Sequence, residues 1–416
     1  MELKRVVVTG IGALTPIGNT ASEYWENLVQ GKSGAAPITH FDASKFKTQF
    51  ACEVKGFDPL DHIDRKEARK MDPFAQYAMV VCTEAVADAG LIESDIDKDR
   101  IGVVLGSGIG GLFTFQQQVL EFGQGDGTPR FNPFFIPKMI SDIAPGHVSM
   151  KFGFRGPNYT TVSACASATN ALIDSFNLIR LGKADVIVSG GSEACVHEAG
   201  VGGFNALHAL SQRNDSPATA SRPFDKERDG FVLGEGAASL ILEEYEHAKA
   251  RGAKIYGEIV GGGLSADAHH LTAPHPEGLG AMNVMKNALK DASLSPEDID
   301  YINVHGTSTP LGDIAEAKAI LQVFGEHSYN LSISSTKSMT GHLLGAAGAI
   351  EALATLMAVK EDIIPPTINF NTPDEDIDQK LDFTFNEAKK REVKAALSNT
   401  FGFGGHNASV IFKKVS

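Results

Sequence analysis

The sequence predicts an α/β fold that is duplicated along the chain. Segments with the pattern of buried strands, such as residues 184–188, alternate with segments of helical spacing, such as residues 168–179. Strands that alternate with helices are typical of mostly parallel sheets. Three short sequence blocks also recur in the same order in both halves, which predicts a pseudo-twofold core. The 416 residues, 43% of them apolar, are sufficient for such a core.

The repeat consists of three pairs of similar segments. Chance similarity of small residues could explain one pair, but three collinear pairs indicate duplication. We therefore divide the chain into an N-terminal half, residues 1–250, and a C-terminal half, residues 251–416. The pairs are DAGL (88–91) with DASL (291–294), SACASATNAL (163–172) with TGHLLGAAGA (340–349), and FVLGEGAASLIL (231–242) with FGFGGHNASVIF (401–412).

Capping residues and glycines mark the ends of the predicted helices. One helix is expected to begin behind Asp72, with Pro73 in its first turn, and to stop at Gly90. A second spans residues 168–179, where apolar residues recur at helical spacing before a glycine. A third covers residues 343–359 and carries glycines on one face, which permits close packing.

The composition argues against several classes of function. The formal net charge of −14 gives no bulk electrostatic basis for binding nucleic acid or an anionic membrane. The N-terminus lacks the continuous apolar region of a signal peptide, and no apolar run approaches the roughly 20 residues that span a bilayer. The four cysteines have neither metal-ligand spacing nor the density of a disulfide scaffold. These features favour the reducing cytoplasm.

Two glycine-rich turns resemble parts of a dinucleotide-binding motif. Residues 10–15 lack the third glycine and the acidic residue that is expected about 20 residues further on. Residues 106–111 are a similarly incomplete match. We therefore expect no nucleotide cofactor.

Cys165 is the first candidate for chemistry. It lies at the junction between a predicted strand and the helix that begins near residue 168. The partial positive charge and free N–H groups of a helix N-terminus favour a thiolate. Its neighbours are small, so a ligand could approach closely. A lone cysteine is more often buried and inert, and this is what we expect of the other three.

Two histidines accompany this cysteine. His305 follows a predicted strand in VHGTSTPLGD, and His342 stands at the start of the predicted helix in STKSMTGHLLGAAG. In the register of the repeat, His342 is the counterpart of Cys165, so the two helix starts should face one another. Each histidine alone would more often be structural, but the set of three favours catalysis. The segment GFGGHN (402–407) could direct a backbone N–H towards an oxyanion or could form only a tight turn.

Together these motifs resemble the elongating beta-ketoacyl-acyl-carrier-protein (ACP) synthases of the thiolase-like superfamily, and most closely the synthase II type. The resemblance covers essentially the whole chain. It implies two mixed five-stranded sheets layered between helices (αβαβα) and a homodimer. The segments that carry it are VVVTGIGALTPIG, KEARKMDPF, ACASATNA, SRPFDKERDGFVLGEGA, HGTSTPLGD, STKSMTGHLLGAAGAIEA and SNTFGFGGHNASVIF.

The resemblance also implies roles in catalysis. Cys165 would be the nucleophile, His305 and His342 the histidine pair, and Lys337 a supporting charge. The backbone N–H groups of Cys165 and Phe403 would form the oxyanion hole, and Phe403 would gate the acyl pocket. The reaction would be the decarboxylative condensation of an acyl group on Cys165 with malonyl-ACP, which gives 3-oxoacyl-ACP and CO2. This scheme requires no organic cofactor and no catalytic metal.

Further residues match the family's binding positions. They are Thr307 and Thr309 for the phosphopantetheine arm; Ile109 and Phe204 for the acyl pocket, with Phe135 and Ile136 reaching over from a partner subunit; Asn303, Glu351, Ser398 and Asn399 for a structural Na+ or K+; and Lys66, Arg69 and Lys70 for docking of the carrier protein. One departure is His208, which stands at a basic position of the docking patch. His406, which neighbours the oxyanion loop, is assigned to structure.

Several alternatives share part of this pattern. A degradative thiolase needs a second cysteine near the C-terminus, and none follows Cys195. Initiating synthases carry asparagine at the position of His342. A cysteine protease would leave the repeat and the second histidine without a role. A polyketide ketosynthase shares the same three residues and stays open, as does a non-catalytic subunit that sets chain length, although such subunits usually lack the nucleophile.

Overall fold

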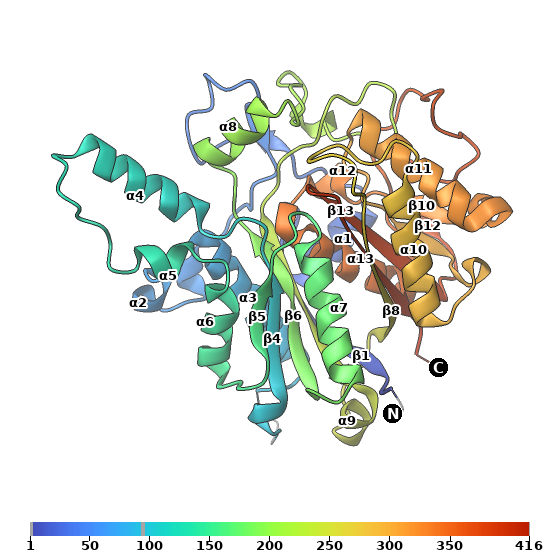
Figure 1. Cartoon of the computed structure of the whole chain (residues 1–416), viewed down its shortest axis with the longest axis horizontal. Coiled ribbons are helices and arrows are strands. Elements are labelled where there is room, and N and C mark those ends of the chain that lie inside the picture. The colour runs from blue at the N-terminus through green and yellow to red at the C-terminus, as the bar shows by residue number, and fades with distance from the viewer. Residues whose placement is uncertain (1–2, 93–95, 416) are drawn as a thin grey trace.

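The main sheet contains ten strands, and the computed structural model describes residues 3–92 and 96–415 of the chain (Figure 1). The strands are β1 (Val6–Leu14), β4 (Ile101–Gly106), β5 (Asn158–Thr161), β6 (Val186–Glu193), β7 (Gly236–Glu244), β8 (Gly257–Ala266), β9 (Tyr301–Asn303), β10 (Ser332–Ser334), β13 (Ala395–Gly402) and β14 (His406–Lys413). Two short ladders pair β2 (Ala36–Pro37) with β3 (Phe50–Ala51), and β11 (Ile363–Ile364) with β12 (Lys389–Lys390).

The two halves of the main sheet match strand for strand. From the outer edge inward, the order is β5-β4-β6-β7-β1 in the first half and β10-β9-β13-β14-β8 in the second. In each half the three outer strands are parallel and the two inner strands are antiparallel. The two halves of the sheet are joined where β1 pairs with β8, over three residue pairs. The prediction of two mixed five-stranded sheets from a duplication is confirmed, with a short seam that joins them.

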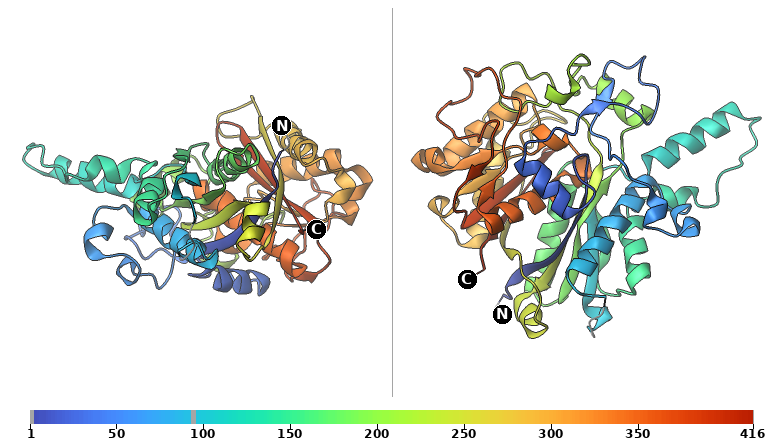
Figure 2. Two further views of the ribbon diagram at one scale, coloured as in Figure 1. Left: turned by 90° about the horizontal axis from the view of Figure 1, so that it is seen from below. Right: turned by 180° about the vertical axis from the view of Figure 1, so that it is seen from behind.

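Helices cover both outer faces of this assembly and fill the space between its halves. They are α1 (Ala21–Val29), α2 (Arg65–Ala68), α3 (Pro73–Asp88), α4 (Leu112–Gln124), α5 (Phe135–Met139), α6 (Ile143–Phe152), α7 (Ser167–Arg180), α8 (Glu198–Ala206), α9 (Tyr245–Ala250), α10 (Leu279–Ala292), α11 (Pro310–Phe324), α12 (Lys337–Thr340) and α13 (Ala347–Glu361). α3 packs on β1 and β7, and α10 packs on β8 and β14. α7 and α13 each contact strands of both halves, which gives the predicted αβαβα layering (Figure 2).

The two inner helices approach each other closely at a glycine. A Cβ atom on Gly348 of α13 would lie 2.1 Å from Thr169 Oγ1 of α7, so a larger residue would push the helices apart. α13 is buried from Ala347 to Val359 and is rich in alanine and leucine, which are strong helix formers. The predicted glycine face is therefore what lets the starts of the two helices meet.

The first two predicted helices have the expected ends, whereas the third begins later than predicted. Asp72 caps α3 by accepting a hydrogen bond from the N–H of Phe74. α13 begins at Ala347 rather than at 343, because His342 is still extended and bridges to Leu233. His342 therefore precedes the helix by one short turn. The division at residue 250 stays a prediction. No helix within 3–92 and 96–415 is long and apolar enough to cross a membrane.

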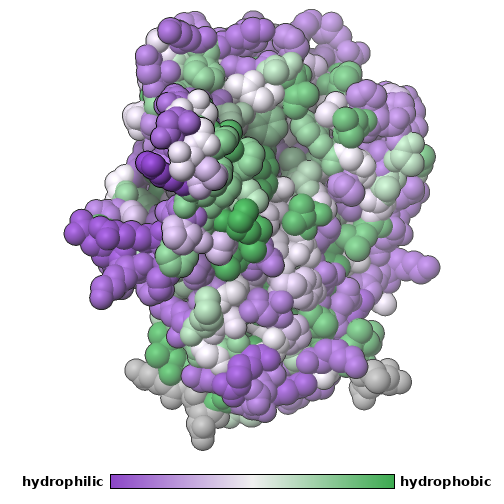
Figure 3. Space-filling model, turned by 60° about the vertical axis from the view of Figure 1, so that its left-hand side comes forward, coloured by the Kyte–Doolittle hydropathy of each residue, from purple (hydrophilic) through white to green (hydrophobic). Residues whose placement is uncertain are grey.

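α4 and α5 form an arm that projects from the body of the molecule (Figures 1 and 2). Aromatic rings stack along it, with ring centroids 5.4 Å apart both for Phe122 with Phe131 and for Phe131 with Phe135. On the face turned forward in Figure 3, hydrophobic residues gather in a central band. The arm exposes several large apolar side chains, namely Phe115, Val119, Leu120, Phe122, Phe131, Phe134 and Ile136.

Candidate active site

Cys165 is placed by a sharp turn between β5 and α7. Ala164, directly before it, has a φ of +51°, in the left-handed region that an alanine adopts only at a cost of about 1–3 kcal/mol. The turn is followed at once by α7, which begins at Ser167. The thiol therefore stands at the start of an inner helix, as predicted.

His342 occupies the equivalent place in the second half and contacts the thiol directly. Its Nε2 lies 3.0 Å from the Sγ of Cys165, across the seam between the halves. The predicted meeting of the two helix starts is confirmed by this contact. The ring of Phe231 lies edge-on to His342, at a centroid distance of 5.3 Å, and holds it from the side.

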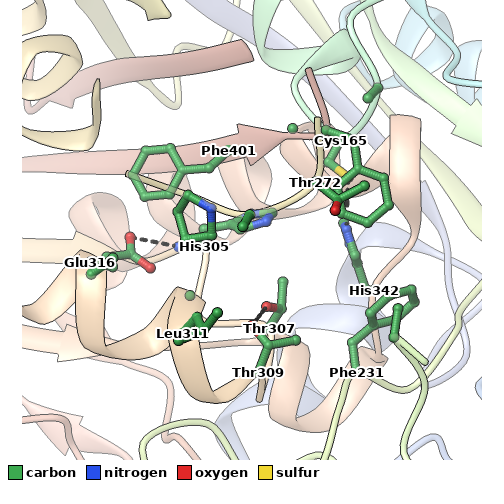
Figure 4. A pocket seen from close by; sticks show the side chains of 18 of the residues that line it. Cys165, Phe231, Thr272, His305, Thr307, Thr309, Leu311, Glu316, His342 and Phe401 are labelled. Atoms are coloured by element: carbon green, nitrogen blue, oxygen red, sulfur yellow. Dashed lines mark hydrogen bonds between the residues drawn. The ribbon is translucent and has the colours of Figure 1, made fainter. Parts of the chain in front are cut away.

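His305 completes the set from the segment after β9. Its ring is perpendicular to that of His342, with an interplanar angle of 88° and a centroid distance of 5.3 Å. The buried carboxylate of Glu316, on α11, accepts hydrogen bonds from the N–H groups of His305 and Gly306 (Figure 4). The backbone that carries His305 is therefore fixed by a side chain of the next helix.

The three residues line one cavity of about 470 Å³. Its walls are largely apolar, which suits an acyl chain, and its mouth includes the adjacent hydroxyls of Thr307 and Thr309, 3.0 Å apart. Most of the predicted catalytic and substrate-binding residues meet here. Those that line the cavity are Cys165, His305, His342, Phe403, Thr307, Thr309, Ile109 and Phe204, together with His208.

Burial keeps the catalytic groups neutral at rest. Desolvation raises the pKa of the Cys165 thiol to about 12, and the nearby charge of Lys337 and the N–H of Phe403 only partly oppose this. Burial, followed by the charge of Lys337, lowers the pKa of His305 and His342 well below the ordinary histidine value. The prediction of an acidic thiol is therefore wrong, because the loss of water around the sulfur outweighs the helix N-terminus.

The glycine-rich turn after β13 approaches the thiol with a backbone donor. The N–H of Phe403 is directed at the sulfur of Cys165, and a Cβ on Gly402 would lie 3.1 Å from the N of Cys165. A Cβ there would also lie 2.8 Å from the O of Ser163, so a glycine lets the end of β13 approach the turn that carries Cys165. The oxyanion hole itself stays a prediction.

Lys337 lies behind the cavity rather than in it. It is 1% exposed and forms an ion pair with the fully buried Glu351 of α13. Burial raises the pKa of Glu351 to about 7, although the ammonium of Lys337 opposes the shift. The predicted supporting charge is thus part of a buried pair whose field reaches both histidines and the thiol.

Other predicted site residues lie away from the cavity. Phe135 and Ile136 belong to the arm, on α5, and Ile136 is 55% exposed. Lys66 and Arg69 are exposed at α2, and Lys70 is paired with Glu67 at 2.7 Å. None of these lines the cavity of its own chain, so a role for them requires a second protein.

Comparison with known proteins decides the family. The beta-ketoacyl synthase N-terminal domain matches residues 3–248, and the C-terminal domain of the same family matches residues 256–371. The chain belongs to the beta-ketoacyl synthase family. The predicted family, fold and enzyme class, an acyl-transferring condensing enzyme, are therefore confirmed.

Individual relatives of this beta-ketoacyl synthase cover its whole length. The 3-oxoacyl-[acyl-carrier-protein] synthase 2 of Synechocystis is 51% identical over 415 residues, which is 100% of this chain and 99% of the relative. A beta-ketoacyl synthase structure from Burkholderia phymatum is 37% identical with a TM-score of 0.92, over 99% of this chain and 100% of that one. A third match is one chain in the structure of a type II polyketide acyl carrier protein in complex with its ketosynthase. That chain is 35% identical with a TM-score of 0.91, over 100% of both chains.

Sequence reasoning missed the groups that hold the catalytic residues of this synthase in place. Glu316 supports His305, Phe231 flanks His342, and the ring of Phe401 lies 5.6 Å from that of His305. Phe231 and Phe401 open the third pair of repeat segments, so their matched positions were a signal that could have found them. Glu316 follows the His305 motif on a helix and carries no comparable signal.

Reactivity of the cysteines tests this account of the thiol. Iodoacetamide should label Cys165 before Cys52, Cys82 and Cys195, because those three are at most 1% exposed and do not line the cavity that Cys165 lines. Since burial raises the pKa of Cys165, its labelling rate should climb about tenfold per pH unit from pH 7 to 9. Mass spectrometry of the labelled peptides gives the rates, with Cys165→Ser as the control. A plateau near neutral pH would instead indicate the acidic thiol.

Removal of the buried ammonium should destabilise the protein in a pH-dependent way. The pKa of Glu351 is already raised to about 7, and Lys337→Met removes the charge that lowers it. At pH 5 the carboxyl is protonated and the variant should unfold near the wild-type denaturant midpoint. As pH rises through 7, ionisation of an unpaired buried carboxylate should cost about 3–5 kcal/mol. The double variant Lys337→Met, Glu351→Gln should recover most of the lost free energy of unfolding. If the stability of Lys337→Met were lower than that of the wild type by the same amount at every pH, the charge-pair account would be contradicted.

Proposed function

We propose that this beta-ketoacyl synthase elongates acyl chains held on acyl carrier protein. An acyl group passes to Cys165 and condenses with malonyl-ACP, which gives 3-oxoacyl-ACP and CO2. The observation that carries the proposal is the thiol–imidazole contact of 3.0 Å inside a mainly apolar cavity that also contains His305. The fatty acid type is favoured over a polyketide role because identity is 51% to a 3-oxoacyl-ACP synthase 2 and 35% to the polyketide ketosynthase.

The first half-reaction transfers the acyl group to the thiol. The S–H of Cys165 donates to the neutral Nε2 of His342 and passes its proton as sulfur attacks the thioester carbonyl. The oxyanion is stabilised by the N–H groups of Cys165 and Phe403. The carrier thiol then leaves and takes the proton from His342. The mainly apolar wall, with Ile109 and Phe204, accommodates the alkyl chain.

The second half-reaction uses the neutral histidines as hydrogen-bond donors. The C–CO2 bond of malonyl-ACP breaks, CO2 leaves, and the electron pair forms an enolate whose oxygen accepts N–H from His305 and His342. The enolate carbon attacks the acyl carbonyl, and the Cys165 sulfur leaves as a thiolate. The thiolate then takes up one proton from solvent, which is the proton that the condensation consumes overall. The buried Nδ1 atoms of both histidines lack a hydrogen-bond partner among the described residues. Nothing there fixes one tautomer, so His342 can accept a proton in one step and donate in the next.

Separation of the two half-reactions tests the proposal. His305→Ala should still accept an acyl group on Cys165 but should release CO2 from malonyl-ACP at least 100-fold more slowly, because one oxyanion-type donor contributes about 2.7–4 kcal/mol. His342→Ala should be defective in both steps, because it also loses the acceptor for the thiol proton. Intact-protein mass spectrometry follows acylation, and labelled CO2 follows decarboxylation. His147→Ala, a buried histidine outside the cavity, is the control. Decarboxylation at the wild-type rate in both variants would refute the roles.

We propose that the enzyme acts as a homodimer. The arm exposes Ile136 and a row of phenylalanines, which a single chain leaves uncovered. β5 forms an edge of the main sheet, and Val162 directly after it is 62% exposed. Exposed apolar surface and a free strand edge both favour association with a second copy. Phe135 and Ile136 would then contribute to the acyl pocket of the partner subunit.

We propose that carrier proteins dock through the basic residues at α2. Lys66 and Arg69 are exposed, while Lys70 already pairs with Glu67. On a chain of net charge −14, this cluster would attract an acidic carrier protein. A solvated helical face is the ordinary explanation of such a cluster, so the proposal depends on its test.

Charge reversal separates docking from chemistry. Lys66→Glu with Arg69→Glu should raise the KM for acyl-ACP several-fold, and should leave turnover of a small acyl-pantetheine unchanged because the cavity is untouched. The difference in KM for acyl-ACP between the variant and the wild type should shrink with added salt, because salt screens charges over about 8 Å at physiological ionic strength. The matched control reverses Lys286 and Lys290, which are exposed on α10. Equal losses with both substrates would indicate a structural role, and no loss with either would place docking elsewhere.

We further propose a structural monovalent cation, Na+ or K+, between β9, β13 and α13. Asn303 and Ser398 are paired across neighbouring strands, and α13, which carries Glu351, packs against both strands. Buried side-chain oxygens of all three lack hydrogen-bond partners among the described residues, which fits such an ion. Asn399 fits only through its backbone, because its side chain is hydrogen-bonded to Glu316 and Ser409. Placement in the cytoplasm likewise stays a proposal.

A further inference from the structure

Glu193, at the end of β6, is a buried carboxylate for which the reaction scheme has no role. Its side chain is fully buried, and it accepts hydrogen bonds from four backbone N–H groups at 2.7–3.2 Å. The hydroxyl of Ser107 lies 3.3 Å away and donates a fifth. The four N–H donors are those of Gly108, Ile109, Gly110 and Gly345.

These donors come from two segments that are far apart in the sequence. Residues 107–110 follow β4 and include Ile109, which lines the cavity. Gly345 lies three residues after His342, beside Leu344, another cavity residue. The carboxylate thus binds the acyl wall and the histidine segment at the same time.

The two segments are in such close contact that only glycines fit between them. A Cβ on Gly345 would lie 2.1 Å from the N of Gly108 and 2.6 Å from Glu193 Oε2. A Cβ on Gly108 would lie 2.8 Å from the same oxygen. The junction is therefore built around the carboxylate, and no other acceptor is placed to serve the four N–H groups.

Two opposed effects act on the ionisation of this side chain. Burial raises the pKa of Glu193, and the hydrogen bonds from the four backbone N–H groups oppose the shift, because they favour the carboxylate. Its negative charge also reaches the active site and acts to raise the pKa of Cys165. Glu193 therefore has two separable properties, its reach across the junction and its charge.

We propose that Glu193 is a positioning residue that holds the Ile109 wall of the acyl pocket against the segment of His342. One carboxylate then sets both the length of chain that the cavity accepts and the place of the histidine at the thiol. This inference rests on the proposed elongation activity. Glu193 touches no reacting atom, so its effect is exerted through Ile109 and His342.

Three substitutions separate reach from charge. Glu193→Gln loses the charge and half of the acceptor capacity, and Glu193→Asp keeps the charge but is one methylene too short to bridge both segments. Gly345→Ala disturbs the junction from the other side. The matched control is Glu84→Gln, another carboxylate that accepts two backbone N–H groups, from Ala13 and Ala21, but lies outside the cavity.

The main measurement is kcat/KM for a series of acyl-ACP chain lengths with malonyl-ACP. In all three variants the ratio of kcat/KM for the best chain length to kcat/KM for the worst should fall about tenfold. This is the size of effect expected from the loss of one charge-assisted hydrogen bond. Glu84→Gln should keep the wild-type ratio even if its melting temperature falls. Glu193→Gln should also shift the pH profile of Cys165 alkylation to lower pH, and Glu193→Asp should not.

The outcomes distinguish this inference from the function on which it rests. If the wild-type protein elongates no acyl-ACP, the proposed function fails. If the wild type elongates and the folded variants keep its chain-length ratio, the positioning role is wrong. If Glu193→Gln does not fold, Glu193→Asp and Gly345→Ala decide the result by the same ratio. If the chain-length ratio of kcat/KM also falls in Glu84→Gln, the cause is a general loss of stability. That result would overturn the assignment of Glu193.

Discussion

The contact between the Cys165 sulfur and His342 Nε2 depends on how closely two helices from opposite halves of the chain can pack. α7 and α13 meet where Gly348 lies against Thr169, and no larger residue would fit there. α7 begins at Ser167, two residues after Cys165, and α13 begins at Ala347, one short turn after His342. A shift of even 1 Å between the helices would lengthen the 3.0 Å contact beyond hydrogen-bond distance. The fold therefore acts on the chemistry through a single packed interface.

Burial of this interface determines the electrostatics of the site. Burial raises the pKa of the thiol and lowers the pKa of both imidazoles, which favours the neutral forms. A neutral imidazole can donate a hydrogen bond to a developing enolate and can also accept a proton from sulfur. The ammonium of Lys337 and three carboxyl groups stand one layer back from the cavity. The carboxyl groups are those of Glu351, Glu193 and Glu316, and burial raises the pKa of each. There they fix backbone and shape the local field without competing for the substrate.

Much of this arrangement could be predicted from the sequence because the duplication is visible in it. Matching SACASATNAL with TGHLLGAAGA placed Cys165 opposite His342, and the structure has them in contact. The ionisation of the thiol could not be predicted, because a helix N-terminus can be recognised locally, whereas loss of solvent depends on the whole fold. The start of α13 was misplaced for a similar reason. The bridge from His342 to Leu233 is a contact between residues over a hundred positions apart.

The supporting carboxylates show why a duplicated fold need not have duplicated chemistry. The paired strands and inner helices of the two halves correspond, but Glu193 closes the end of β6 while Glu316 belongs to α11. Both accept successive backbone N–H groups beside a catalytic segment, so two unrelated positions solve one physical problem. A buried backbone N–H group that has no acceptor costs free energy on folding. In each half a buried glutamate accepts these hydrogen bonds and thereby ties the backbone of a loop that lines the cavity.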